Sequence, residues 1–132
     1  MPSVLLVDNQ PSVRHGLRLL LGLERDISVV GEAGNGAEAL AAADALDPDL
    51  VIMDVEMPGM DGLCAAEQLS RRHPRSALII LTMHNGLHIS EGAVAARAFA
   101  LVSKSRPRDL LDAVRVWLHK EPAASIERNI GA

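Results

Sequence analysis

The feature that most constrains the fold is a short apolar run at residues 50–53, Leu-Val-Ile-Met, which ends on the carboxylate of Asp54. Four apolar residues are too few for a helix, so this run predicts a strand that is buried on both faces. Pro58, Gly59 and Gly62 follow, and the chain must therefore turn at the carboxyl end of the strand. Ligands bind at this edge of an open α/β sheet, which makes Asp54 a candidate nucleophile or metal ligand. The alternative is that Asp54 only caps the turn, because Asp is common in turns.

Strand-like and helix-like patterns alternate along the whole chain. Buried strands separated by helices of about 10–15 residues are typical of a parallel sheet that is covered on both faces. Right-handed crossovers then restrict the α/β fold to a doubly wound sandwich. The predicted strands cover residues 4–7, 27–33, 50–54, 77–82 and 99–102, and the predicted helices cover residues 11–22, 37–46, 63–73, 89–96 and 107–118.

Composition limits the classes of function. The 132 residues suit one domain, and a net charge of −4 argues against direct binding of nucleic acid by this segment. No apolar run approaches the roughly 18 residues of a membrane span, so we expect a cytoplasmic protein without membrane contact. Cys64 is the single cysteine; its place in a helical pattern predicts a small packed side chain rather than a reactive thiol.

Polar side chains stand at the ends of four predicted strands. Because parallel strands end at a common sheet edge, we expect these side chains to lie together. Carboxylate and amide oxygens suit a hard divalent cation, whereas a hydroxyl and an ammonium group suit phosphoryl oxygens. Each residue alone has a structural interpretation as a cap, a strand end or a solvated lysine, but their joint placement favours a site. The residues are Asp8, Asn9, Asp54, Thr82 and Lys104.

Several motifs, in this order and spacing, resemble those of bacterial response-regulator receiver domains over about residues 3–119. The resemblance implies a flavodoxin-like sheet with strand order 2-1-3-4-5. Further similarity, at residues 10–17, 30–33 and 82–84, is to the subfamily with a C-terminal helix-turn-helix DNA-binding domain. The motifs that carry the family resemblance are residues 4–9 (Val-Leu-Leu-Val-Asp-Asn), Met53-Asp54, residues 57–62 (Met-Pro-Gly-Met-Asp-Gly), Leu81-Thr82 and Lys104.

The resemblance implies that Asp54 is a phosphoacceptor beside a Mg²⁺ ion. Asp8 and Asn9 would belong to the metal pocket, and Glu56 would contribute its backbone carbonyl to the ion. Family members usually have two adjacent acids where this chain has Asp8 and Asn9, so one formal charge is missing beside the metal. The Glu56 side chain, two residues after Asp54, could supply some of that charge by reaching over the site.

The resemblance also assigns the residues that respond to phosphorylation. Thr82 would be the switch hydroxyl, and Lys104 would contact the phosphoryl group. The position three residues before Lys104, where receivers often carry an aromatic switch residue, is Leu101. The glycines that are common just upstream correspond to Arg97 and Ala100. Coupling between Thr82 and an aromatic ring is therefore not expected.

We expect residues 1–119 to form the receiver domain and residues 120–132 to be a linker or tail toward an output domain. The leading hypothesis is a switch phosphorylated by a histidine kinase, a phosphoacceptor that assists its own phosphorylation and slow dephosphorylation rather than an enzyme. The rival is a degenerate receiver that acts as an interaction module without phosphorylation. A flavodoxin-like FMN binder is disfavoured because aromatic residues are lacking near the strand ends, and a hydrolase because no second acid or base is placed for turnover.

The last predicted helix carries more apolar residues than one core-facing stripe needs. Leu110, Leu111, Val114 and Leu118 are expected to be core residues. Trp117 is large enough to be seldom fully buried, and we predict that it is partly exposed and contributes to a homodimer or interdomain contact.

Overall fold

The computed structural model describes residues 1–57, 61–83 and 87–120. Five strands alternate with five helices, as the sequence predicts, and most boundaries agree within one residue. Residues 58–60 and 121–132 lie outside the described part, and with them the predicted turn at Pro58-Gly59 and almost all of the predicted linker. The elements are β1 Ser3–Val7, α1 Pro11–Leu21, β2 Ser28–Ala33, α2 Gly36–Leu46, β3 Leu50–Asp54, α3 Gly62–Arg72, β4 Ala77–Thr82, α4 Leu87–Ala95, β5 Ala100–Ser103 and α5 Pro107–Leu118.

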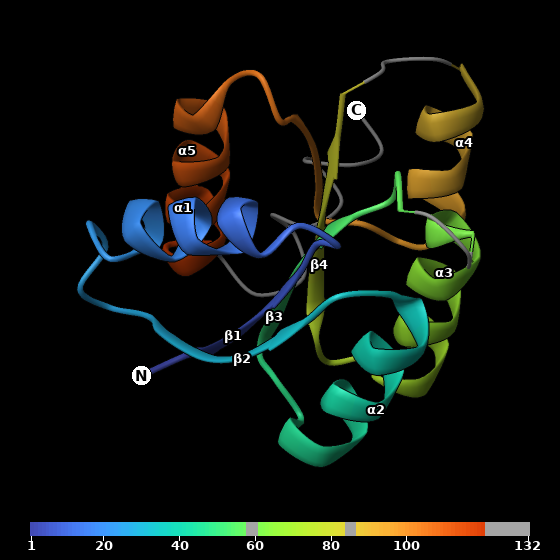
Figure 1. Ribbon diagram of the computed structural model, residues 1–132, viewed down its shortest axis with the longest axis horizontal. Helices are drawn as coiled ribbons and strands as arrows, with labels where there is room; N and C mark the ends of the chain where they lie inside the picture. Colours follow the sequence, from blue (N-terminus) through green and yellow to red (C-terminus); the bar gives the residue numbers. More distant parts are fainter. Residues whose placement is uncertain (58–60, 84–86, 121–132) are drawn as a thin grey trace.

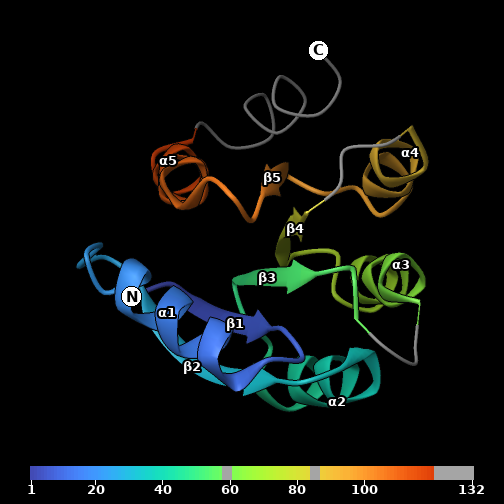
Figure 2. The same cartoon turned by 45° about the horizontal axis from the view of Figure 1, so that its top comes forward.

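The strands form one parallel sheet in the order β2-β1-β3-β4-β5. Helices α1 and α5 cover one face, and α2, α3 and α4 cover the other (Figures 1 and 2). This arrangement is the predicted doubly wound, flavodoxin-like fold, with β2 at an edge. The three inner strands have all or nearly all of their residues buried, which explains their uninterrupted apolar sequences.

Alternate residues of each strand enter two separate cores. Val51 and Met53 of β3 pack toward α2, α3 and α4, together with small residues such as Ala39. Leu50 and Ile52 pack toward α1 and α5, on the face that contains Phe99 and Trp117. Alanines dominate the first core because α2 and α3 lie close together there. An aromatic-poor composition is thus sufficient for a closely packed protein.

Local sequence signals account for several helix ends. Pro11 and Pro107 occupy the first turns of α1 and α5, where a missing N–H costs little. At α2, the Asn35 side chain accepts from the backbone N–H of Glu38, and the Glu38 carboxylate accepts from the backbone N–H of Gly34, both at 2.9 Å. This reciprocal cap stabilises the first turn of the helix.

Two findings depart from common patterns or from our expectations. Arg97 adopts φ 56° after α4, a left-handed conformation that usually favours glycine and costs about 1–2 kcal/mol for an L-residue. Arg97 is one of the positions at which the resemblance noted above leads us to expect glycine. Cys64, predicted to be packed, is exposed on α3 because its position falls on the outer side of the helix.

Among the described residues, no helix is long and apolar enough to span a membrane.

Candidate functional site

The carboxyl ends of β1, β3, β4 and β5 bring four of the five predicted site residues to one edge of the sheet. Asp8 follows β1, Asp54 ends β3 and Thr82 ends β4, and all three side chains are buried. Lys104 follows β5, and its backbone N–H donates to the carbonyl of Thr82 at 2.9 Å. Asn9, the fifth residue, is exposed beside Asp8. The parallel topology thus converts residues far apart in sequence into neighbours.

The ammonium group of Lys104 joins the two acids of this edge. Its Nζ donates to Oδ2 of Asp8 at 2.9 Å and to Oδ2 of Asp54 at 3.0 Å. The acidic side chains are 0% and 2% exposed, and that of Lys104 is 18% exposed. Two carboxylates withdrawn from water are tolerated here because one cation and further hydrogen bonds compensate their charge.

Backbone N–H groups fix the remaining carboxylate oxygens. Oδ1 of Asp8 accepts from the N–H of Gln10 at 2.9 Å, and Oδ1 of Asp54 accepts from the N–H of Glu56 at 2.8 Å. Both bonds run from a residue two positions later, an Asx-type turn in which the carboxylate orders the loop after its own strand. The proposed turn-capping role of Asp54 is therefore real, and it accompanies rather than replaces the contact with Lys104.

Burial and pairing act in opposite directions on the charges of the site. Burial raises the pKa of the Asp54 carboxyl, and the hydrogen bonds from Glu56 and Lys104 offset that rise only in part. For Lys104, burial is the largest single influence and lowers the pKa, but the hydrogen bonds and charges of Asp8 and Asp54 together outweigh it and raise the pKa above its usual range. Lys104 therefore carries its charge at neutral pH.

The two carboxylates, Asp8 and Asp54, fit a Mg²⁺ ion that keeps several of its water ligands. Among the described residues, no group of three or more His, Cys, Asp or Glu side chains is arranged to hold a metal. Two carboxylates, Asp8 and Asp54, nevertheless share the Lys104 ammonium and so lie close together. Mg²⁺ keeps several waters and commonly takes only one or two protein carboxylates plus substrate phosphates. Asn9 and the Glu56 backbone carbonyl stay predicted ligands.

Arg14 supports the site, although the sequence analysis gave it no role. Its Nη1 donates to the carbonyl of Asp8 at 2.6 Å, and its Nε donates to Glu32 of β2 at 2.8 Å. Arg18 also bonds Glu32, and hydrogen bonds from Arg18 and Arg14 lower the pKa of that carboxyl. The sequence signal that could have identified this role is the spacing of Arg14 and Arg18, which lie four residues apart and therefore share one face of the helix.

The Glu56 side chain has partners that the sequence analysis did not identify. Its Oε1 accepts from Oγ1 of Thr82 at 2.9 Å and from the backbone N–H of Met83. The Glu56 carboxylate thus engages the end of β4. Sequence reasoning could not anticipate this because the direction of a loop side chain depends on which partners the fold brings near it.

Leu101 and Trp117 pack in the two hydrophobic cores. Leu101 is half-buried and packs against the core on the α2, α3 and α4 face. Trp117 is only 6% exposed, so the prediction that it is partly exposed was wrong. The indole fills the core between α5 and the sheet, and its helix position faces inward together with Leu110 and Val114.

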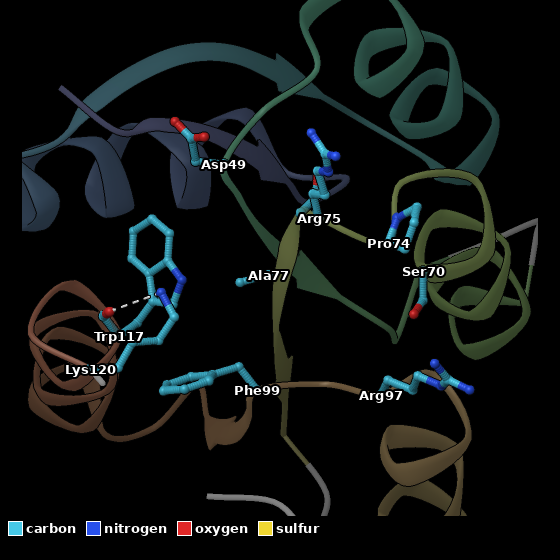
Figure 3. Close-up of a pocket in the computed structure, with 10 residues that line it drawn as sticks. Asp49, Ser70, Pro74, Arg75, Ala77, Arg97, Phe99, Trp117 and Lys120 are labelled. Atoms are coloured by element: carbon cyan, nitrogen blue, oxygen red, sulfur yellow. Dashed lines mark hydrogen bonds between the residues drawn. The ribbon is translucent and has the colours of Figure 1, made fainter. Parts of the chain in front are cut away.

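Trp117 lines a cavity of about 340 Å³ that also touches Asp49, at the start of β3, and Ala77, at the start of β4 (Figure 3). Because the four site strands run parallel, this cavity lies at the opposite end of the sheet from Asp54. The Lys120 ammonium sits 5.0 Å from the centre of the indole ring. Trp117 is therefore a core residue remote from the acidic edge.

Comparisons with known proteins agree with this geometry. The family described as response regulator receiver domain matches residues 4–115. The nitrate/nitrite response regulator NarL of Escherichia coli (strain K12) is 35% identical over 115 residues, covering 85% of this chain and 52% of NarL. The transcriptional regulatory protein LiaR of Bacillus subtilis (strain 168) is 36% identical over 123 residues, covering 92% of this chain and 58% of LiaR. The chain thus spans a little over half the length of these relatives.

Solved structures give the same result for the fold. The isolated receiver domain of RcsB from Salmonella enterica serovar Typhimurium, studied with the phosphomimetic BeF₃⁻, superimposes with a TM-score of 0.84 at 27% identity and 98% coverage of both chains. A second RcsB structure, described as bound to the promoter rprA, has a TM-score of 0.81 at 28% identity and covers 89% of this chain and 62% of RcsB. With its buried pair of acids, its bridging lysine and this set of matches, the chain belongs to the response-regulator receiver domain family.

Proposed function

We propose that this chain is a phosphorylation-controlled switch in which Asp54 accepts a phosphoryl group from the phosphohistidine of a partner histidine kinase. The observation that carries the proposal is the Lys104 ammonium, hydrogen-bonded to both Asp8 and Asp54 at a buried sheet edge. This arrangement holds a carboxylate nucleophile in place and sets a cation beside the point where phosphoryl oxygens arrive. The rival function, a degenerate receiver, lacks an equally specific observation in its favour.

The transfer is an in-line displacement. An oxygen of the Asp54 carboxylate forms a bond to phosphorus while the bond from phosphorus to the imidazole nitrogen breaks, and the electron pair leaves on that nitrogen. Lys104 stabilises the charge on the equatorial oxygens, so the protein contributes mainly positioning and electrostatics. Asp8, Asp54, the Asn9 side chain and the Glu56 carbonyl would hold Mg²⁺. The ion, when bound, supplies further charge neutralisation to the transferring group.

The output of the switch is proposed from the relatives. NarL and LiaR are named as response and transcriptional regulators, and one RcsB structure is described as bound to a promoter. We therefore infer that the chain is the cytoplasmic receiver part of a transcriptional regulator and reaches DNA only through a separate output domain. The net charge of −4 agrees with the absence of direct DNA binding by the receiver itself. A homodimer stays a prediction. Trp117 is no longer proposed to contribute to its interface, because the side chain is buried in the core.

A labelling experiment tests the proposed function. The protein is incubated with Mg²⁺ and the small phosphodonor acetyl phosphate, and intact-mass spectrometry should detect the addition of one phosphoryl group. Removing Mg²⁺ with a chelator should suppress the labelling, and proteolytic mapping should place it on residues 50–57. A wild-type protein that stays unlabelled with Mg²⁺ and also with a cognate kinase would favour the degenerate receiver.

The substitution Asn9→Asp should tighten Mg²⁺ binding. A carboxylate about 4 Å from a cation gains about 1 kcal/mol per unit charge even at the dielectric constant of water, which corresponds to about fivefold in affinity. Asn9 is exposed, so the added charge needs little desolvation. Isothermal titration of the variant and the wild type measures the difference. Equal affinities would show that residue 9 does not face the metal.

A further inference from the structure

The Glu56 carboxylate connects the loop after β3 to the end of β4. Its Oε1 accepts a hydrogen bond from Oγ1 of Thr82 at 2.9 Å and another from the backbone N–H of Met83. Thr82 is fully buried, whereas Met83 is exposed. One carboxylate oxygen therefore holds both the last residue of β4 and the residue that follows it.

Glu56 is also tied to the phosphoacceptor through its main chain. Its backbone N–H donates to Oδ1 of Asp54 at 2.8 Å. The same residue thus contacts Asp54 with its backbone and Thr82 with its side chain. Glu56 thus provides a direct hydrogen-bonded connection from the Asp54 carboxylate to the Thr82 hydroxyl.

A hydroxyl has only one proton to donate. While Thr82 donates to Glu56, it cannot donate to an oxygen of a phosphoryl group on Asp54. We propose that the Glu56 carboxylate is a positioning residue, a latch that holds the Thr82 hydroxyl and the Met83 amide in the unphosphorylated arrangement and must release them when Asp54 is phosphorylated. This inference rests on the proposed function, because it assigns to Glu56 the control of that same site.

Electrostatics favours release of the latch by phosphorylation. A phosphoryl group brings about −1.5 to −2 charges at neutral pH, close to the loop that carries the Glu56 carboxylate. Repulsion between the two anions opposes the Glu56 position that Thr82 and Met83 stabilise. Because such coupling is reciprocal, an intact latch also weakens binding of a phosphoryl-like anion at Asp54.

The first test measures binding of beryllofluoride, a phosphoryl mimic, in the presence of Mg²⁺. Glu56→Ala should bind it about threefold to tenfold more tightly than the wild type, as expected when one competing hydrogen bond is removed. Glu56→Gln, which keeps a side-chain acceptor, should show a smaller gain. The matched control is Glu67→Ala on α3, where the carboxylate is paired with Arg71 away from the site, and it should leave the affinity unchanged.

The second test separates the latch from a simple charge effect of Glu56. In a Thr82→Val background there is no hydroxyl to hold, so Glu56→Ala should raise the beryllofluoride affinity by a clearly smaller factor than in the wild type. The double-mutant cycle measures this difference directly. Equal factors in both backgrounds would mean that Glu56 acts on the anion without Thr82, and the latch would be overturned.

The third test needs no phosphoryl mimic. The exposed Met83 amide donates to Glu56, so Glu56→Ala should speed hydrogen exchange at Met83 by about threefold to tenfold, whereas Glu67→Ala should not. Unchanged exchange in Glu56→Ala would overturn the latch, even if beryllofluoride binds normally. Failure of every variant and of the wild type to bind beryllofluoride would instead overturn the proposed function, while the exchange result still decides whether the latch exists.

Discussion

Replacing Asp54 by Asn should abolish phosphoryl transfer to this chain. The variant keeps the size of the side chain but lacks the carboxylate that we propose as the nucleophile, and the neighbouring Asp8 is already held by Gln10 and Lys104. Intact-mass spectra after incubation with acetyl phosphate and Mg²⁺ should show no adduct. Asp26→Asn, an exposed acid outside the site, serves as the control and should be labelled like the wild type. Undiminished labelling of Asp54→Asn would refute the assignment of the acceptor.

The same variant should be more stable than the wild type at neutral pH. Burial raises the pKa of Asp54 in the folded protein. Such a carboxyl favours folding below its unfolded pKa, and this contribution is lost as the pH rises through the folded pKa. Removing the buried charge should therefore raise the free energy of unfolding at pH 7. The gain should shrink as the pH falls through the carboxyl range, which urea titrations at several pH values would reveal.

Replacing Lys104 by Met should produce the largest loss of stability. The change leaves Asp8 and Asp54, both buried, without the cation that bridges them. Removing one partner of a buried ion pair commonly costs about 3–5 kcal/mol, and the partial exposure of Lys104 reduces our expectation to about 2–3 kcal/mol at pH 7. Urea unfolding provides the measurement, with Arg108→Met, an exposed cation on α5, as the control.

The loss in Lys104→Met should depend on pH. Without the ammonium group, the pKa of Asp54 rises further, so protonation at lower pH removes the unpaired charge and restores stability. The double variant Lys104→Met/Asp54→Asn should recover part of the loss at pH 7 for the same reason. A loss that is independent of pH and of residue 54 would show that Lys104 acts by packing of its methylene stem instead of by its charge.

The position of the site was predictable because it follows from topology. Short apolar runs such as residues 50–53, bounded by turn residues, favour buried strands, and parallel strands end at the same edge, so Asp8, Asp54, Thr82 and Lys104 were expected to meet. Topology does not predict the direction of side chains on loops. The Glu56 carboxylate follows no periodic pattern, and its contacts with Thr82 and Met83 depend on how two loops approach each other.

Helix periodicity places a residue on a face only approximately. Trp117 and Val116 are adjacent in α5, yet the first is buried and the second is 47% exposed. The width of the apolar stripe could not be derived from the sequence because it depends on how α5 sits on the sheet. The exposure of Cys64 has the same cause on α3, since residues on either side of it, Leu63 and Ala65, are buried.

The burial of Trp117 makes the chain its own spectroscopic probe. This residue is the single tryptophan, it lies in the core between α5 and the sheet, and Asp54 is at the other end of the strands. An indole in such an apolar setting emits at shorter wavelength than one in water, so unfolding should shift the emission to the red. Its fluorescence therefore follows global unfolding of every variant without an added dye. Because Trp117 is remote from the acidic edge, substitutions at Asp54 or Lys104 do not alter the immediate surroundings of the indole.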